Sequence, residues 1–480
     1  MITLHNIING EIVQDRAADG TAADGSAGPT LPFFDPATGV QLGTAPDSDA
    51  ATVDRAFQAA HTAFQSYKRT TPAERQAMML RLADLIEANV DRLLDAEVAC
   101  TGKPRPVTRE IEILRGADQL RFFAGACRVV SGTAQTEYVR GFSSTVRREP
   151  LGVVAQITPW NYPFMMAIWK IGPALAAGNT LVLKPADTTP WSTLILGELA
   201  QEAYPAGVVN VICGGRGTGA AMVEHQIPEM VSITGSTRAG AQVMSAASKT
   251  LKDVHLELGG KAPAIVFADT DIDLAAREIA LGAFFNAGQD CTAVTRVLVE
   301  DSIHHEFGAA LADAAAALKV GGDAADLGPL NSAAQLDRVE GFMSRLPANA
   351  RVLAGGKRTG AGFHFEPTVI DGVFQADEVV CEEIFGPVVT VQPFATEEEA
   401  IELANGTKYA LASSVWSNNH GVVTRVSNEL DFGAVWINCH QVIPAEAPHG
   451  GFKHSGTGKD LSVFGLEDYT RIKSVTTSHR

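Results

Sequence analysis

One cysteine of the chain lies in a setting that suits a nucleophile. Cys291 follows the small-residue turn Ala287-Gly288-Gln289 and precedes a run of β-forming residues. A thiolate presented by such a turn can attack an electrophile when nearby N–H groups favour the anion. The six cysteines of the chain form no CxxC pair, which is typical of reduced, buried thiols without chemistry. That interpretation is the commoner one for any single cysteine, Cys291 included, and no metal site is expected.

A carboxylate and an amide also stand where ligands are often bound. Glu257, in HLELGGKAP, precedes two glycines that let backbone approach a ligand closely, so it can act as a general base. A solvated or salt-bridged carboxylate is the commoner explanation of an isolated glutamate. Asn161, in ITPWNYP, follows a strand-like run, where its amide can face an anion or shape a turn. Ser236 and Thr237 stand at a strand-to-helix junction that attracts phosphate, although helix capping alone explains both.

Short apolar runs alternate with helical patterns between about residues 150 and 250. This alternation favours parallel strands with right-handed crossovers, hence a doubly wound α/β sheet, which binds dinucleotides at the carboxyl ends of its strands. No strict GxGxxG occurs, because GGRGTG at 214–219 has the wrong spacing, so a standard Rossmann fingerprint is absent from the sequence. We predict strands over 153–157, 180–184, 208–212 and 230–234 and helices over 163–176, 191–203 and 237–248.

A second α/β block follows and indicates a second domain. Upstream of both blocks, Thr71 is predicted to cap a scaffold helix, with Pro72 at the first position and Glu74 closing a capping box. The stretch from Asp15 to Thr30 is rich in Ala, Gly, Asp and Ser and is predicted to be a surface loop without assigned function. The strands expected in the second block cover 264–267, 294–299, 411–416 and 434–438.

Composition narrows the classes of function. A chain of 480 residues exceeds a single hydrophobic core, so two or three domains are expected. The 38 basic and 55 acidic residues give a net charge of -17, which repels nucleic acids and anionic membranes. No apolar run reaches the roughly 18 residues that a membrane helix needs, and the start MITLHNIINGEIVQD lacks a signal-peptide pattern. We therefore expect a cytoplasmic globular enzyme without nucleic-acid or membrane partners.

Seven motifs occur in the order and at the approximate spacings of one enzyme superfamily: PWNYP, LVLKP, ITGST, LELGGKAP, GQDC, EEIFGP and GGFKHSG. Through them the chain resembles the aldehyde dehydrogenase superfamily over nearly its whole length. The resemblance implies a Rossmann-like NAD-binding domain over 1–128 and 150–256 and a second α/β catalytic domain over 257–450. It also implies a small β-hairpin oligomerisation region over 129–149 and 451–480, through which members usually form homodimers or homotetramers.

The resemblance assigns catalytic roles to three residues. Cys291 matches the nucleophile, which would form a thiohemiacetal and then a thioester with a small aldehyde. The Asn161 side chain and the Cys291 backbone N–H match the oxyanion hole. Glu257 matches the carboxylate that activates water to hydrolyse the thioester, and its presence favours hydrolysis over acyl transfer to coenzyme A.

The resemblance also implies NAD as the coenzyme. Lys184 matches a ligand of the adenosine ribose, Ser236 a ligand of the pyrophosphate, and Glu383 with Phe385 the contacts of the nicotinamide ribose. Asp187 stands where many NAD-using relatives have glutamate, and its shorter carboxylate still repels a 2′-phosphate, which favours NAD over NADP. The other coenzyme-binding residues implied by position are Ile157, Thr158, Trp160, Gly217 and Leu258.

The segments APHGGFKHSGTGKDLSVFGLEDYT and FFNAGQDCTA look most like the bacterial 4-aminobutyraldehyde dehydrogenase branch, which neighbours the betaine aldehyde enzymes. 4-Aminobutanal is therefore the predicted substrate, and its ammonium group requires carboxylates or aromatic faces at the pocket mouth. Arg115 would neutralise such an acidic mouth, which leaves an uncharged or acylated aldehyde as an alternative beside betaine aldehyde. The residues predicted to line the substrate pocket are Glu112, Asp118, Tyr162, Trp169, Asp290 and His449.

These pocket assignments compete with plainer explanations. Helix-surface charge explains Glu112 and Asp118, core packing explains Trp169, and turn capping explains Asp290. A non-catalytic relative that kept the fold as a binding protein is the remaining alternative of a different class. Such a protein has no need for the catalytic cysteine, glutamate and asparagine together.

Overall fold

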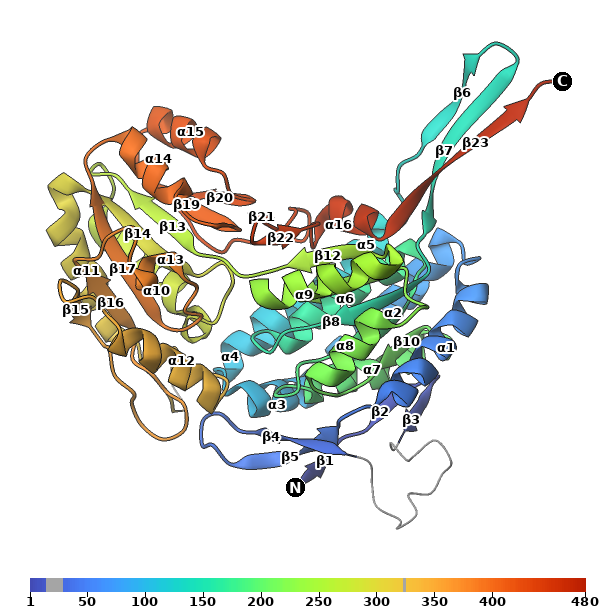
Figure 1. The fold of residues 1–480 in the computed structure, drawn as a ribbon, viewed down its shortest axis with the longest axis horizontal. Helices are drawn as coiled ribbons and strands as arrows, with labels where there is room; N and C mark the ends of the chain where they lie inside the picture. The colour runs from blue at the N-terminus through green and yellow to red at the C-terminus, as the bar shows by residue number, and fades with distance from the viewer. Residues whose placement is uncertain (14–28, 323–324) are drawn as a thin grey trace.

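The computed structural model describes residues 1–13, 29–322 and 325–480. Most of the loop predicted from Asp15 to Thr30 lies outside the described residues. Two α/β domains face each other, and a narrow β arm projects from the first of them (Figure 1). No helix of the described residues is long and apolar enough to cross a bilayer.

The first domain is built on an eight-stranded sheet with the order β22-β12-β11-β8-β9-β10-β2-β3, in which β2 (Asn6–Ile8) and β3 (Glu11–Val13) form one edge. Its five central strands run parallel, and β8, β9 and β11 are buried runs of mostly β-branched and leucine residues, as expected of a sheet covered on both faces. The predicted doubly wound fold is confirmed. The central strands are β12 (Asp253–Glu257), β11 (Met230–Thr234), β8 (Val153–Ile157), β9 (Thr180–Lys184) and β10 (Val209–Val211).

Helices on both faces close the core of this domain. The predicted capping box is present, because the Thr71 side chain accepts from Glu74 N while the Glu74 side chain accepts from Thr71 N. A π-helical segment, η1 (Arg109–Leu114), leads into α5 (Arg115–Ala126), which packs on α2 and α6 beside the active site. The other helices are α1 (Ala50–Tyr67), α2 (Pro72–Ala88), α3 (Val90–Thr101), α6 (Pro163–Ala177), α7 (Trp191–Ala203), α8 (Arg216–Glu224) and α9 (Thr237–Ala247).

The second domain is built on a seven-stranded sheet with the order β15-β16-β17-β14-β13-β19-β20. All neighbouring pairs are parallel except β15 with β16, and α10 (Ile272–Phe284) and α11 (His304–Ala317) pack against each other beside the sheet. The strands are β15 (Arg351–Ala354), β16 (Thr368–Asp371), β17 (Val388–Phe394), β14 (Val294–Glu300), β13 (Ala262–Val266), β19 (Ala412–Trp416) and β20 (Ala434–Ile437).

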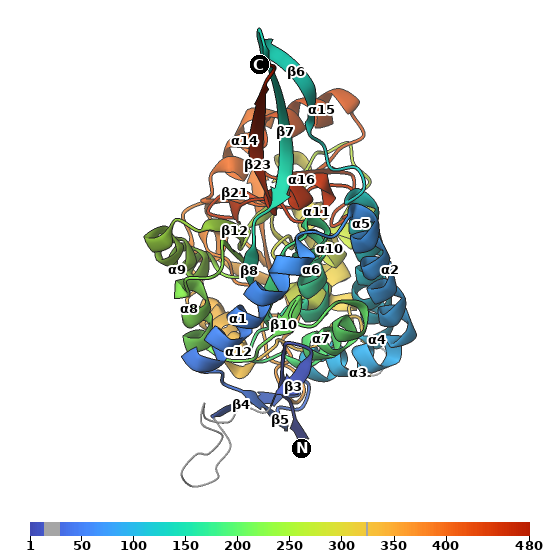
Figure 2. The same ribbon diagram turned by 90° about the vertical axis from the view of Figure 1, so that its right-hand side faces the viewer.

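The arm is a three-stranded antiparallel sheet of β6 (Thr133–Val139), β7 (Phe142–Pro150) and β23 (Thr470–Ser478). It stands clear of both domains, with the C-terminus near its tip (Figure 1, Figure 2). The sequence placed all of 451–480 with this arm, and that boundary is corrected. β22 (Gly456–Thr457) instead extends the first sheet beside β12, and α16 (Ser462–Asp468) packs on α6.

Candidate active site

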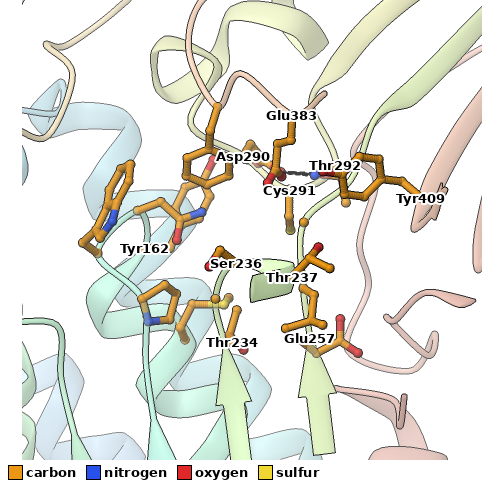
Figure 3. A pocket seen from close by; sticks show the side chains of 18 of the residues that line it. Tyr162, Thr234, Ser236, Thr237, Glu257, Asp290, Cys291, Thr292, Glu383 and Tyr409 are labelled. Atoms are coloured by element: carbon orange, nitrogen blue, oxygen red, sulfur yellow. Dashed lines mark hydrogen bonds between the residues drawn. The ribbon is translucent and has the colours of Figure 1, made fainter. Parts of the chain in front are cut away.

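A cavity of about 780 Å³ lies where the carboxyl ends of β8, β11 and β12 face the segment that precedes β14. The open carboxyl edge of parallel strands is the usual ligand site of such sheets. Cys291, Glu257 and Ser236 line this active-site cavity (Figure 3), and Asn161 lines it as well. Residues separated by about 130 positions in the sequence thus meet around one space.

Cys291 is held by a tight turn in the left-handed region of backbone space. Asn286 and Ala287 have φ of 51° and 54°, and Gly288 has 68°. A Cβ on Gly288 would lie 2.2 Å from the carbonyl oxygen of Gly386, so this position excludes larger residues. Burial, with the negative charges of Asp290 and Glu257, raises the pKa of the Cys291 thiol well above its ordinary value. The resting sulfur is therefore a thiol that needs a base.

Asn161 follows β8 and lies beside that cysteine turn. Its side-chain Nδ2 donates to the backbone carbonyl oxygen of Gln289 at 3.1 Å. The backbone carbonyl oxygen of Asn161 accepts from Asn286 Nδ2 at 3.0 Å. An amide nitrogen carries two hydrogens, so one N–H remains for a ligand oxygen next to the sulfur. This arrangement suits an oxyanion donor.

Glu257 ends β12 and is 3 % exposed. Its Oε1 has no hydrogen-bond partner among the described residues, although it is buried. A Cβ on Gly450 would lie 2.4 Å from that oxygen, so the absence of a side chain at Gly450 gives the carboxylate its room. Burial and the charge of Asp460 raise the pKa of Glu257 well above its ordinary value. A carboxyl group with a raised pKa is a stronger base than an ordinary glutamate once it is deprotonated.

Three buried side chains lie near Glu257 and contact one another. They are Lys170, His255 and Asp460, and we call them the Lys170 cluster. Lys170 Nζ donates to Asp460 Oδ2 at 2.9 Å, and His255 Nε2 lies 3.1 Å from Asp460 Oδ1. Despite its burial, the charges of Lys170 and His255 hold the pKa of Asp460 well below its ordinary value. Burial is the largest cause of the raised pKa of Glu257. The charge of Asp460 raises that pKa further and the charge of Lys170 lowers it, so the cluster adjusts the proton affinity of the carboxylate.

Several residues predicted for the coenzyme line the other part of the cavity. Trp160, Ser236, Leu258, Glu383 and Phe385 all do so. Ser236 caps α9, whose first N–H groups face the cavity, and a helix N-terminus of this kind suits a phosphate. Glu383 Oε1 accepts from Gly260 N at 2.9 Å, and burial raises the pKa of Glu383 to about 7.

The remaining residues predicted for the coenzyme do not line that cavity. Ile157 ends β8, Lys184 ends β9, Asp187 is exposed in the following turn and Gly217 lies in α8. Thr158 is buried directly after β8. Lys184 Nζ donates to the carbonyl oxygens of Pro185 and Gly214, both at 2.9 Å. These residues form the edge of the sheet beside the cavity, on the side of α8.

Four of the predicted substrate residues line the cavity: Tyr162, Trp169, Asp290 and His449. The Tyr162 hydroxyl donates to Asp290 Oδ2 at 2.7 Å, and Asp290 Oδ1 accepts from the backbone N–H and the hydroxyl of Thr292. The rings of Trp169 and His449 meet edge to face at 5.0 Å. Burial lowers the pKa of His449, which favours the neutral imidazole beside Trp169.

Glu112 and Asp118 do not line the cavity, and the expectation that they do is corrected. Asp118 points to solvent from α5. Glu112 is 2 % exposed and accepts from Lys103 Nζ at 2.8 Å, while Glu97 Oε1 lies 3.9 Å from the same nitrogen. We call Lys103, Glu97 and Glu112 the Lys103 cluster. The Lys103 ammonium lies 4.3 Å from the ring centroid of Tyr162, so the cluster packs against this residue of the cavity wall.

Sequence reasoning missed the Lys170 cluster. No local pattern joins Lys170, within α6, to His255 in β12 and Asp460 after β21 (Phe452–Lys453). A lysine inside an otherwise apolar, wholly buried helix was the available signal, because a buried ammonium needs a carboxylate partner.

The fold and the cavity define a class of protein: a two-domain α/β enzyme that holds a cysteine nucleophile and a buried carboxylate base over a doubly wound sheet. The model of the aldehyde dehydrogenase family matches residues 23–475. The chain belongs to the aldehyde dehydrogenase family.

Relatives with known names agree over nearly the whole chain. An aldehyde dehydrogenase of Emericella nidulans is 42% identical over 460 residues, which cover 94% of this chain and 92% of that protein. The NAD+ complex of an aldehyde dehydrogenase from Bacillus cereus superposes with a TM-score of 0.95 at 38% identity, covering 100% and 97% of the two chains. A betaine aldehyde dehydrogenase from Staphylococcus aureus in complex with NAD+ gives a TM-score of 0.93 at 36% identity, covering 99% and 94%.

Proposed function

We propose that this protein oxidises an aldehyde to its carboxylic acid with NAD and hydrolyses the thioester intermediate with its own carboxylate. The observation that carries the proposal is the unpartnered, buried Oε1 of Glu257 in the cavity that also holds the Cys291 thiol. A nucleophile and a base around one cavity are the pair that thioester formation and hydrolysis require.

The first half of the reaction uses the cysteine turn. Glu257 takes the thiol proton, the sulfur of Cys291 bonds to the aldehyde carbon, and the carbonyl π electrons move onto oxygen. The free N–H of Asn161 and the backbone N–H of Cys291 donate to that oxyanion, and one such donor lowers the barrier by about 3 to 4 kcal/mol. NAD, when bound, supplies the acceptor for the hydride that leaves the carbon.

Hydrolysis then uses Glu257 a second time. Glu257 first releases the thiol proton to solvent. Its carboxylate then takes a proton from water, the hydroxide adds to the thioester carbon, and the carbon–sulfur bond breaks to release the acid. The leaving thiolate recovers a proton and the site returns to its resting state. The raised pKa of Glu257 suits both steps, because it makes the carboxylate a stronger acceptor for the proton of the thiol and of water.

The coenzyme would lie along the carboxyl edge of the first sheet. Ser236 and the N-terminus of α9 would hold its pyrophosphate, Glu383 and Phe385 its nicotinamide ribose, and Lys184 its adenosine ribose. The fit is supported by Thr234 Oγ1, a buried polar atom of the cavity without a partner among the described residues. The exposed carboxylate of Asp187 favours NAD over NADP by charge repulsion.

For the substrate, we propose an aldehyde without a distal cation. 4-Aminobutanal stays a prediction from resemblance, as does betaine aldehyde, and the carboxylates expected to hold an ammonium lie elsewhere. Glu112 is paired with Lys103, Asp118 faces solvent, and both oxygens of Asp290 already accept hydrogen bonds. The alternative with an uncharged or acylated aldehyde therefore has the better support.

The experiment is NADH formation by the purified protein with hexanal, an acylated aminoaldehyde, 4-aminobutanal and betaine aldehyde. We expect oxidation of hexanal and the acylated compound, and loss of steady-state turnover in Cys291→Ala by at least about 10⁴-fold, because no other group can carry the acyl intermediate. A clear preference for either cation would contradict the substrate proposal. Full activity of Cys291→Ala would contradict the mechanism.

The arm supports a further proposal, that the protein forms a homodimer or homotetramer. All residues of β6 are exposed in the single chain, and Tyr138, Val139 and Ile472 are 70%, 64% and 66% exposed. Large apolar side chains on a projecting sheet edge usually mark an interface, and β6 and β23 are the two edge strands of that sheet.

A further inference from the structure

A second, smaller cavity continues outward from the active-site cavity. It has a volume of about 130 Å³ and shares Tyr162, Trp169 and Asp290 with the active-site cavity. We call it the outer cavity. An extended aldehyde that reaches Cys291 with its carbonyl carbon would therefore place its distal end there.

Two polar side chains of the outer cavity lie on one face of α5. Arg115 is the first residue of the helix and Gln119 follows one turn later, so both side chains project to the same side. Arg115 is exposed and lines the outer cavity, and among the described residues the ion pairs of this region involve Arg105, Arg109 and Arg121 but not Arg115. A permanent positive charge without a partner thus stands in the wall of the outer cavity.

The side-chain amide of Gln119 is oriented so that its nitrogen remains available to donate a hydrogen bond. Trp169 Nε1, which can only donate, forms a 2.8 Å hydrogen bond to Gln119 Oε1. Gln119 is 1 % exposed, yet its Nε2 donates to no acceptor of the described residues. The tryptophan therefore turns the amide to present N–H groups rather than its carbonyl oxygen.

A third donor comes from the loop after β20. Gln441 lines the outer cavity, and its Nε2 is buried without a hydrogen-bond partner among the described residues. Its backbone has a φ of 58°, a conformation that costs free energy in a residue other than glycine. A buried, unpaired donor is unfavourable unless a ligand satisfies it.

One carboxylate opposes these donors. Asp290 lines the outer cavity, but Oδ2 accepts from Tyr162 and Oδ1 accepts from Thr292. Its oxygens are therefore directed to the protein. The outer cavity is left with a guanidinium and two amide nitrogens that lack acceptors, which is the donor set that binds a carboxylate.

From this donor set we infer that the outer cavity recognises a carboxylate at the distal end of the substrate, so that the preferred substrate is an ω-oxo acid and the product a dicarboxylate. The inference rests on the proposed function, because it concerns the substrate of the same active site. Arg115 supplies the charge, while Gln119 and Gln441 supply directed hydrogen bonds. This would exclude an ammonium group by repulsion from Arg115.

The test compares kcat/KM for aldehydes of equal length that differ at the distal end. Linear ω-oxo acids of four to six carbons are set against butanal, pentanal, hexanal and 4-aminobutanal. We expect the best oxo acid to exceed the neutral aldehyde of its length by at least about tenfold. In Arg115→Gln that preference, the ratio of kcat/KM for the oxo acid to kcat/KM for the neutral aldehyde, should fall by at least about tenfold.

Arg69→Gln is the matched control, because it removes the same charge from an exposed position outside both cavities. A second readout without turnover is competitive inhibition by glutarate, which should weaken in Arg115→Gln but not in the control. If neutral aldehydes are oxidised and the oxo acids are no better, the inference fails while the proposed function stands. If no aldehyde yields NADH, the proposed function itself fails.

Discussion

The Lys170 cluster and the Lys103 cluster are built alike and lie near the same cavity, yet they differ in what they touch. Each buries a lysine against carboxylates with almost no exposure. In the Lys170 cluster, Asp460 lines the cavity and its charge acts on the carboxylate of Glu257. In the Lys103 cluster, no member lines the cavity, and the ammonium packs on the back of Tyr162.

This difference shows that a buried charged side chain is not necessarily a functional one. Burial raises the pKa of Glu112 as it does that of Glu257, so proton affinity does not separate them. The distinguishing feature is access. Each glutamate has one buried oxygen without a hydrogen-bond partner among the described residues, but Glu257 lines the active-site cavity, whereas Glu112 lies outside it and accepts from Lys103. Three substitutions test the comparison.

The largest effect is expected at Glu257, the glutamate that lines the active-site cavity. Glu257→Gln keeps the shape of the side chain but removes the base, so kcat should fall by about 10² to 10⁴-fold. The same carboxylate also takes the thiol proton, so acylation of Cys291 should slow as well, and intact mass measurements can follow the acyl group on the cysteine. Glu402→Gln, at an exposed site in α14 (Glu397–Asn405), is the control and should behave as the wild type. Unchanged turnover in Glu257→Gln would remove its role as base.

An intermediate effect is expected in the Lys170 cluster. Asp460→Asn leaves the buried ammonium of Lys170 without its counter-charge, which should lower the free energy of unfolding by about 3 to 5 kcal/mol. Loss of the negative charge also lowers the pKa of Glu257, so the acidic limb of the kcat–pH profile should move to lower pH. If the acidic limb of the kcat–pH profile keeps its wild-type position, Asp460 does not influence the pKa of the base.

The same variant has a pH signature in stability. The pKa of Asp460 is lower in the folded chain than in the unfolded one, so its contribution is present above the unfolded pKa of about 4 and is lost as the pH falls. Urea unfolding should therefore show the gap between wild type and Asp460→Asn narrowing in acid. A gap that widens in acid would contradict the assignment.

The smallest effect is expected in the Lys103 cluster. Glu112→Gln imitates the protonated acid that burial favours, and Lys103 keeps Glu97 at 3.9 Å. We expect a loss of about 1 to 2 kcal/mol in unfolding free energy and a kcat within about twofold of the wild type. Thermal unfolding and steady-state NADH formation measure both quantities. A selective loss of kcat at unchanged stability would show that this cluster takes part in catalysis.

Helices and strands that depend on the local sequence pattern were predicted well. The apolar runs at β8, β9 and β11 and the capping box at Thr71 and Glu74 depend on neighbouring residues, and they were found where the sequence placed them. β10 proved shorter by one residue at each end, since strand ends depend on pairing. The boundary at 451 was wrong because β22 joins a distant sheet, a choice made by register and not by local propensity.

The sequence by itself determined the doubly wound sheet, the family motifs and the residues that line the active-site cavity at Cys291, Glu257 and Asn161. It could do so because periodicity and short motifs are local properties of the chain. Only the tertiary structure decided which charges face that cavity. It paired Glu112 with Lys103, brought Asp460 to Lys170 across 290 positions, and left Arg115 without a partner among the described residues. Such pairing follows from which surfaces pack together, and burial then forces each charge to find a counter-charge or a ligand.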